Sequence, residues 1–141
     1  MYTVIGWVVL VYSPGDDDSP ASNRLALDAL IAGFRADWGP AATIEVRDHT
    51  LDRVLFLHTS NNRSVDRPEE LGMFLQELGR LYPGSYGLVH EHVDDREEAR
   101  WNEYRVRVMV RGVMTDHHDP YFSPIQPTIE DGVGPRSGSG T

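Results

Sequence analysis

The sequence contains no cysteine and no lysine, and each absence removes a class of function. Without cysteine there are no disulfides, no thiol nucleophiles and no thiolate metal ligands. Without lysine there is no phosphate-binding loop of the type that ends in Gly-Lys-Ser or Gly-Lys-Thr. The serines also lack the Gly-x-Ser-x-Gly pattern that places a nucleophile on a strand-to-helix turn. These absences argue against hydrolase and nucleotide-binding functions.

Long hydrophobic runs are also missing. No apolar run approaches the roughly 18 to 20 residues that a membrane-spanning helix needs, and the longest, Val8 to Val11, predicts a strand. The first residues, Met1 to Thr3, lack the basic region and the cleavage site of a secretory signal. We therefore expect a soluble protein located in the cytoplasm.

Basic residues are scarce relative to acidic ones. The chain has 13 Lys+Arg, all of them arginine, against 22 Asp+Glu, which gives a formal net charge of −9. A field of this sign repels nucleic-acid phosphates and anionic lipid and attracts cationic partners. Acidity also keeps a domain soluble, so the charge alone does not separate solubility from a steering role. It argues against nucleic acid and membranes as partners.

Length and composition fit one globular domain. The chain has 141 residues, of which 40% are hydrophobic and 25% are charged, as is usual for a single folded unit. Its end, Ser137 to Thr141, contains only serine, glycine and threonine. We expect one domain over residues 1–131 and a flexible C-terminal tail over residues 132–141.

Hydrophobic periodicity predicts five strands and two helices. In chain order these are a strand at 3–12, a helix at 22–38, strands at 43–47 and 54–58, a helix at 67–81, and strands at 85–93 and 102–113. The β-α-β-β-α-β-β order predicts an α+β fold, a two-layer sandwich in which a mainly antiparallel five-stranded sheet carries both helices on one face. The proline-rich residues after Val113 predict an irregular C-terminal extension.

Alternation within the strands predicts which side chains face the helices. We expect Trp7 to lie on the helix-covered face of the sheet, next to Leu30 and Phe34. In the last strand Arg105 and Arg107 fall on one side and the valines on the other. We expect the side that carries these arginines to be exposed.

Histidines and carboxylates suggest a possible metal site. His117, His118 and Asp119 are consecutive, and His90 and His92 project to one face of a strand. Imidazole and carboxylate are competent ligands for zinc. The spacing matches no metal-binding signature, and adjacent histidines do not easily aim at one ion, so structural or surface histidines are the better interpretation. A small metal-dependent enzyme is nevertheless the alternative function.

Acid–base catalysis by Glu91 beside His90 or His92 is a weaker idea, because in an alternating strand Glu91 faces away from both histidines.

The remaining candidate site is an acidic interface in the connections between elements. Loops that combine carboxylates with aromatic side chains suit a binding surface, because aromatics supply burial and acids select an arginine- or lysine-rich partner. The other interpretation is that the acids solvate the loops while the aromatics, Tyr121 and Phe122 in particular, pack inward. The predicted partner-binding residues are Asp94, Asp95, Glu97, Glu98, Trp101, Asp116, Asp119 and Tyr121.

Several short motifs are spread along the chain: Gly6-Trp7, Tyr86-Gly87-Leu88, Arg111-Gly112, the stretch from Asp119 to Pro124, and Pro127 to Asp131. Together they resemble the immunity protein 7 family of bacterial polymorphic toxin systems. The stretch Asp-Pro-Tyr-Phe-Ser-Pro is the most specific of them, and Ile5 stands where the family often has a histidine. The resemblance spans about residues 1–131. It implies an intracellular α+β protein that binds and neutralises a cognate toxin domain, with no catalytic residues and no cofactor.

Overall fold

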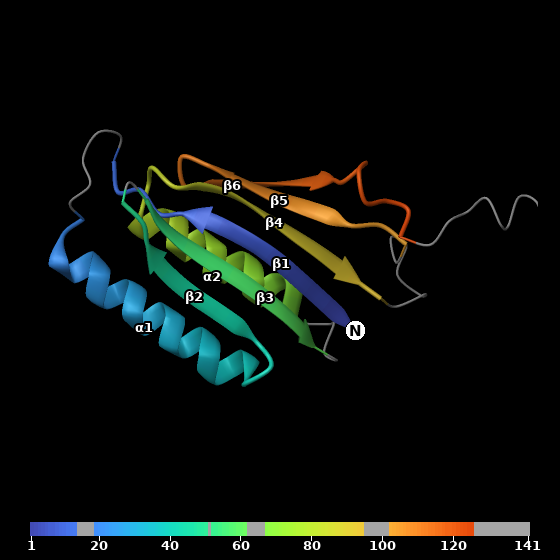
Figure 1. The fold of residues 1–141 in the computed structure, drawn as a ribbon, viewed down its shortest axis with the longest axis horizontal. Helices are drawn as coiled ribbons and strands as arrows, with labels where there is room; N and C mark the ends of the chain where they lie inside the picture. The colour runs from blue at the N-terminus through green and yellow to red at the C-terminus, as the bar shows by residue number, and fades with distance from the viewer. Residues whose placement is uncertain (14–18, 51, 62–66, 95–101, 126–141) are drawn as a thin grey trace, which may run out of the picture.

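The protein is a single antiparallel sheet with two helices packed on one of its faces (Figure 1). The computed structural model describes residues 1–13, 19–50, 52–61, 67–94 and 102–125. Its elements are β1 (Tyr2–Val9), α1 (Ala21–Trp38), β2 (Thr43–Asp48), β3 (Arg53–Asn61), α2 (Arg67–Leu81), β4 (Tyr86–Val93), β5 (Arg105–Val110) and β6 (Val113–His118). The strand order is β2-β3-β1-β4-β5-β6, and every neighbouring pair is antiparallel. The predicted α+β class is confirmed.

Both helices form where the apolar spacing predicts them. Leu27, Ile31, Phe34 and Trp38 of α1 recur every three or four residues, and all four are buried. The α2 helix buries the corresponding stripe around Leu71, with Glu69 and Glu70 in its first turn, where a negative charge is favourable.

The hydrophobic core lies between the helices and the sheet. Tyr2, Leu55, Leu75 and Leu78 are among its fully buried side chains. Between the helices, the Phe34 ring stacks on Trp38 with a centroid separation of 4.8 Å and meets Phe74 at 4.7 Å. These ring contacts join the two helices, and Trp38 also meets Tyr2 of β1 at a centroid separation of 6.2 Å, which ties the helix layer to the sheet.

The sheet has six strands where the sequence predicts five. The single strand predicted over residues 102–113 is a hairpin, in which β5 turns at Arg111 and Gly112 and returns as β6 in place of the predicted irregular extension. Both turn residues have positive φ, 51° and 74°. Such a two-residue turn matches the twist of an antiparallel pair, and glycine adopts its geometry without steric cost. Because valine continues the apolar pattern on both sides of the turn, the sequence pattern does not reveal the turn.

Two predictions about the faces of the sheet are wrong. In β1, Tyr2, Val4 and Val8 point toward the helices, so Trp7 points the other way and is 38% exposed. Arg107, on the same side of β5 as the buried Met109, faces the helix layer. In β1 the apolar run places bulky residues on both sides of the strand, so the pattern does not fix which side is covered.

Candidate functional site

The face of the sheet opposite the helices carries a band of apolar side chains. In register, Trp7 of β1 lies between Phe56 of β3 and Leu88 of β4, and Leu88 is followed by Val108 of β5. Phe56 is 39% exposed, close to the value for Trp7. Side chains opposite one another on neighbouring strands are in contact range. We call this surface the open face; its exposed apolar residues are Ile5, Trp7, Phe56, Tyr86, Val110 and Val113.

A row of histidines lies beside that band. Ile5 pairs with His58 on one side and His90 on the other, and Val106 lies between His90 and His117. Successive histidines are thus two strands apart, about 9.6 Å at the usual strand spacing.

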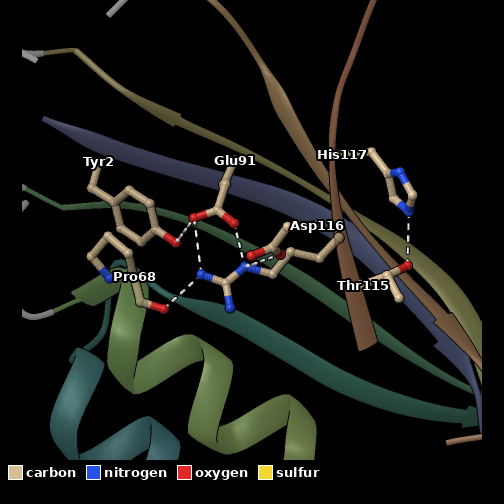
Figure 2. Close-up of polar contacts among 7 residues, drawn as sticks. Tyr2, Pro68, Glu91, Thr115, Asp116 and His117 are labelled. Carbon is tan, nitrogen blue, oxygen red and sulfur yellow. Dashed lines mark hydrogen bonds and ion pairs between the residues drawn. The ribbon is translucent and has the colours of Figure 1, made fainter. Parts of the chain in front are cut away.

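The histidines of β6 diverge as the alternation of a strand requires. His117 lies on the open face, where its Nε2 is 2.8 Å from the Thr115 hydroxyl (Figure 2). His118 is on the helix side, with its Nδ1 3.4 Å from a Glu103 carboxylate oxygen. Among the residues that the structure describes, no group of three or more His, Asp or Glu side chains is placed to hold a metal ion.

Residues 119–125 fold against one end of the open face. The Phe122 ring meets His90 edge-on at 5.4 Å and lies 6.0 Å from Tyr104. Asp119 is only 3% exposed; its Oδ2 accepts a hydrogen bond from the Phe122 backbone N–H at 2.7 Å. The Ser123 hydroxyl accepts another from the Tyr104 N–H at 2.9 Å. The Asp-Pro-Tyr-Phe-Ser motif therefore fixes this segment to β4 and to the start of β5.

On the helix side, a buried polar network joins β1, β4 and β5 (Figure 2). The Tyr2 hydroxyl donates to Glu91 Oε1 at 2.7 Å, and the Arg107 guanidinium donates to both oxygens of the same carboxylate. Arg107 also donates to the Pro68 carbonyl at 2.7 Å, at the start of α2, and lies 3.9 Å from Asp116.

The pKa shifts in this network follow from its burial and pairing. Burial, followed by the charge of Glu91, raises the pKa of the Tyr2 hydroxyl far above its usual value. Burial alone would lower the pKa of the Arg107 guanidinium, but the hydrogen bond and the charge of Glu91 outweigh it, so this pKa is raised. Since each charged group has its partner within the protein, the arrangement is that of a structural ion pair.

A groove runs between α2 and the edge strand β6. Its volume is about 610 Å³, and its walls include Glu69, Met73, Met114 and Asp116. Asp116 is thus placed at a groove beside the helix layer, with its side chain on the opposite side of the sheet from Trp7.

The predicted interface residues are dispersed. Asp94 is exposed at the end of β4, where its N–H donates to the Met1 carbonyl at 2.7 Å. Tyr121 is 87% exposed. The alternative interpretation, in which Tyr121 packs inward, is therefore wrong. Asp119 is buried. The other four residues, Asp95, Glu97, Glu98 and Trp101, lie outside the described residues.

Sequence reasoning missed the open face. Its signal was present in the spacing: the exposed Ile5 and Trp7 alternate with the buried Val4 and Val8. A tryptophan followed by two valines hid that alternation.

The family of the chain follows from a comparison with family models. The model described as "Immunity protein 7" matches residues 1–131, a range that includes all six strands and both helices. The chain belongs to the immunity protein 7 family. No curated protein matches it.

One solved structure resembles this family member at low similarity, a phage SAM lyase in complex with S-methyl-5'-thioadenosine. The identity is 11%, the TM-score is 0.38, and the match covers 86% of this chain and 91% of that one. A likeness at this level carries no argument about function.

Neither helix in the described ranges combines the length and the hydropathy needed to cross a bilayer.

Proposed function

We propose that this protein is an immunity protein that binds a cognate bacterial toxin domain in the cytoplasm and neutralises it as a stoichiometric inhibitor. The match of the immunity protein 7 family to residues 1–131 carries this proposal. Inhibition by binding requires a shaped surface and no chemistry from the inhibitor itself, so the proposal assigns neither a catalytic residue nor a cofactor to this chain.

The charge of the chain supports a basic toxin as the partner. A formal net charge of −9 attracts a cationic domain over distances of about 10 Å at moderate salt and raises the rate of encounter. We assign the steering role to Asp94 and Asp116, which are exposed, and also to Asp95, Glu97 and Glu98, which lie outside the described residues. Trp101 and Tyr121 are the aromatic contacts proposed with them. Asp119, which is buried and bonded to Phe122, is assigned to the fold.

Co-expression with the product of the neighbouring gene tests the function. The neighbour, induced alone, should arrest growth, and co-expression of this chain should restore growth and yield a 1:1 complex in native mass spectrometry. Leu75→Asp, which places a charge at a fully buried core position, is the control that should not protect. A neighbour that is harmless by itself, or that does not bind this chain, would refute the proposal.

Salt dependence tests the basic partner separately. The association rate should fall steeply as ionic strength rises, and changing Asp94, Asp95, Glu97 and Glu98 together to their amides should lower that rate while leaving dissociation nearly unchanged. An association rate that does not respond to salt would contradict electrostatic steering.

A further inference from the structure

The open face is an exposed sheet surface that the described helices leave uncovered. Both α1 and α2 pack on the opposite side of the sheet (Figure 1). Trp7 and Phe56, opposite one another on the central strands β1 and β3, each leave more than a third of their surface in water. Soluble monomers rarely expose contiguous apolar patches of this kind unless the patch binds something.

This surface is also depleted of charge. Across the open-face positions of the six strands the formally charged side chains are Glu45 and Arg47, both at the β2 edge, and they pair with each other at 3.0 Å. The central strands present tryptophan, phenylalanine, isoleucine and histidine there. An apolar, aromatic centre without unpaired charge is the composition of an interface core.

The dimensions suit a protein partner. Six strands at the usual spacing are about 24 Å across, and six residues of strand are about 20 Å long, so the sheet surface covers about 480 Å² in projection. Side-chain relief and the rim formed by residues 119–125 add to this area. The strand surface alone is about six tenths of the roughly 800 Å² that each partner contributes to a stable protein interface, and these additions raise it toward that value.

We infer that the open face is the surface on which the toxin domain docks, with Trp7 and Phe56 as its central anchors; this inference rests on the proposed function. The choice of occupant follows from charge. A second copy of this chain would bring another net charge of −9 against the first, whereas a basic domain is attracted by the same field. The expected partner surface is an apolar centre surrounded by arginine or lysine.

Tyr121 and Phe122 extend this surface at one end. Phe122 is 61% exposed although its ring touches His90, so the segment after β6 continues the aromatic surface beyond the strands. Asp94 directly follows β4, the strand that carries His90. The aromatic anchors at the centre are expected to slow dissociation, and the acids near the end of β4 are expected to speed association.

The test measures binding of an inactivated toxin domain to matched variants of the full chain by biolayer interferometry. Trp7→Ala and Phe56→Ala should each raise Kd at least about 30-fold, mainly through faster dissociation. Leu25→Ala on α1 and Met73→Ala on α2 are the controls, because both side chains are exposed and apolar, 71% and 64%, but lie in the helix layer. Each should change Kd less than about 3-fold. Far-ultraviolet circular dichroism and thermal unfolding verify the fold of every variant.

If loss of the Trp7 or Phe56 ring disturbs the sheet, Ile5→Arg provides a test of the open face that removes no ring. Ile5 is 52% exposed, and a cation there should repel a basic toxin without emptying the core. Weak binding by the open-face variants together with normal binding by the helix variants supports the inference. Normal binding by all three open-face variants, or loss of binding in the helix variants alone, overturns it and leaves the proposed function standing. A wild-type dimer that Ile5→Arg dissociates assigns the face to a second copy and overturns it too. If the wild-type chain does not bind the toxin domain, both proposals fail.

Discussion

Two helical glycines, Gly79 in the last turn of α2 and Gly33 inside α1, offer a sharp test of how α2 packs on the sheet. At Gly79 of α2 a methyl group would overlap the Gly112 carbonyl oxygen and would lie 2.8 Å from its carbonyl carbon. Both neighbours are backbone atoms of the β5–β6 turn, which the Gly112 N–H anchors to the Ser85 carbonyl at 2.9 Å. At Gly33 of α1 a methyl group would meet nothing within 4 Å.

The expected magnitudes follow from these surroundings. Alanine is favoured over glycine in a helix by about 1 kcal/mol, and overpacking a rigid contact costs about 1 to 3 kcal/mol. Because a carbon atom normally approaches a carbonyl oxygen no closer than about 3.3 Å, Gly79→Ala must push the hairpin away by more than about 1 Å. We expect Gly79→Ala to lower the free energy of unfolding by about 2 kcal/mol and Gly33→Ala to raise it by up to about 1 kcal/mol.

Urea denaturation followed by circular dichroism at 222 nm measures both variants against the wild type. The two substitutions are chemically identical, so their difference of about 3 kcal/mol reports the packing of α2 against the turn. Equal stabilisation by both would refute the close contact between Gly79 and Gly112.

Three further outcomes are expected from equilibrium unfolding. Glu91→Ala should lower the free energy of unfolding by about 3 to 5 kcal/mol, because it leaves Arg107 charged and buried without its partner. Glu91→Gln keeps an acceptor for Tyr2 and should lower it less. Equal losses in the two variants would contradict the ion pair. The folded state holds the Tyr2 proton above its ordinary pKa of 10.0, so stability should fall as pH rises past about 10, by up to about 1.4 kcal/mol per pH unit. Tyr2→Phe should remove that part of the decline, and an unchanged pH slope would argue against the raised pKa. Trp7→Ala should cost about 2 kcal/mol, below the 3 to 5 kcal/mol expected for the buried Phe74→Ala, and similar losses would mean that the open face is covered.

The elements that the sequence predicts correctly are those with a single unambiguous period. The α2 helix begins and ends where the sequence predicts, at residues 67 and 81, because Pro68 suits the first turn and the Pro83-Gly84 pair follows the end. The β2–β3 hairpin is similar, since the polar run at residues 48–50 separates two short apolar segments.

The two wrong predictions about the faces of the sheet share one physical cause. A residue-by-residue pattern shows that neighbours in a strand face opposite ways, but the tertiary packing decides which way is inside. Arg107 faces inward because Glu91 and the Pro68 carbonyl, both distant in sequence, compensate its charge there. Trp7 faces outward because Val4 and Val8 occupy the core side of β1.

The acidic site shows the same limit. Asp119 belongs to the motif most typical of the family, and sequence reasoning assigned it to a partner because it is a carboxylate in a connecting segment. In the structure it accepts a backbone N–H in the turn that places Phe122 on Tyr104. Whether a carboxylate serves the fold or a partner depends on such local hydrogen bonds, which spacing does not reveal.

The central position of the first strand has a consequence for synthesis. Strand β1 comes before all the other strands in chain order, but its two neighbours are β3 and β4, so the last of its pairing partners is Val93. The chain must therefore be translated as far as Val93 before this strand has both of its partners. Pairings this distant slow folding, typically to milliseconds or longer, because each must close a long loop. The sheet of this family member therefore cannot close around β1 until β4 has been synthesised.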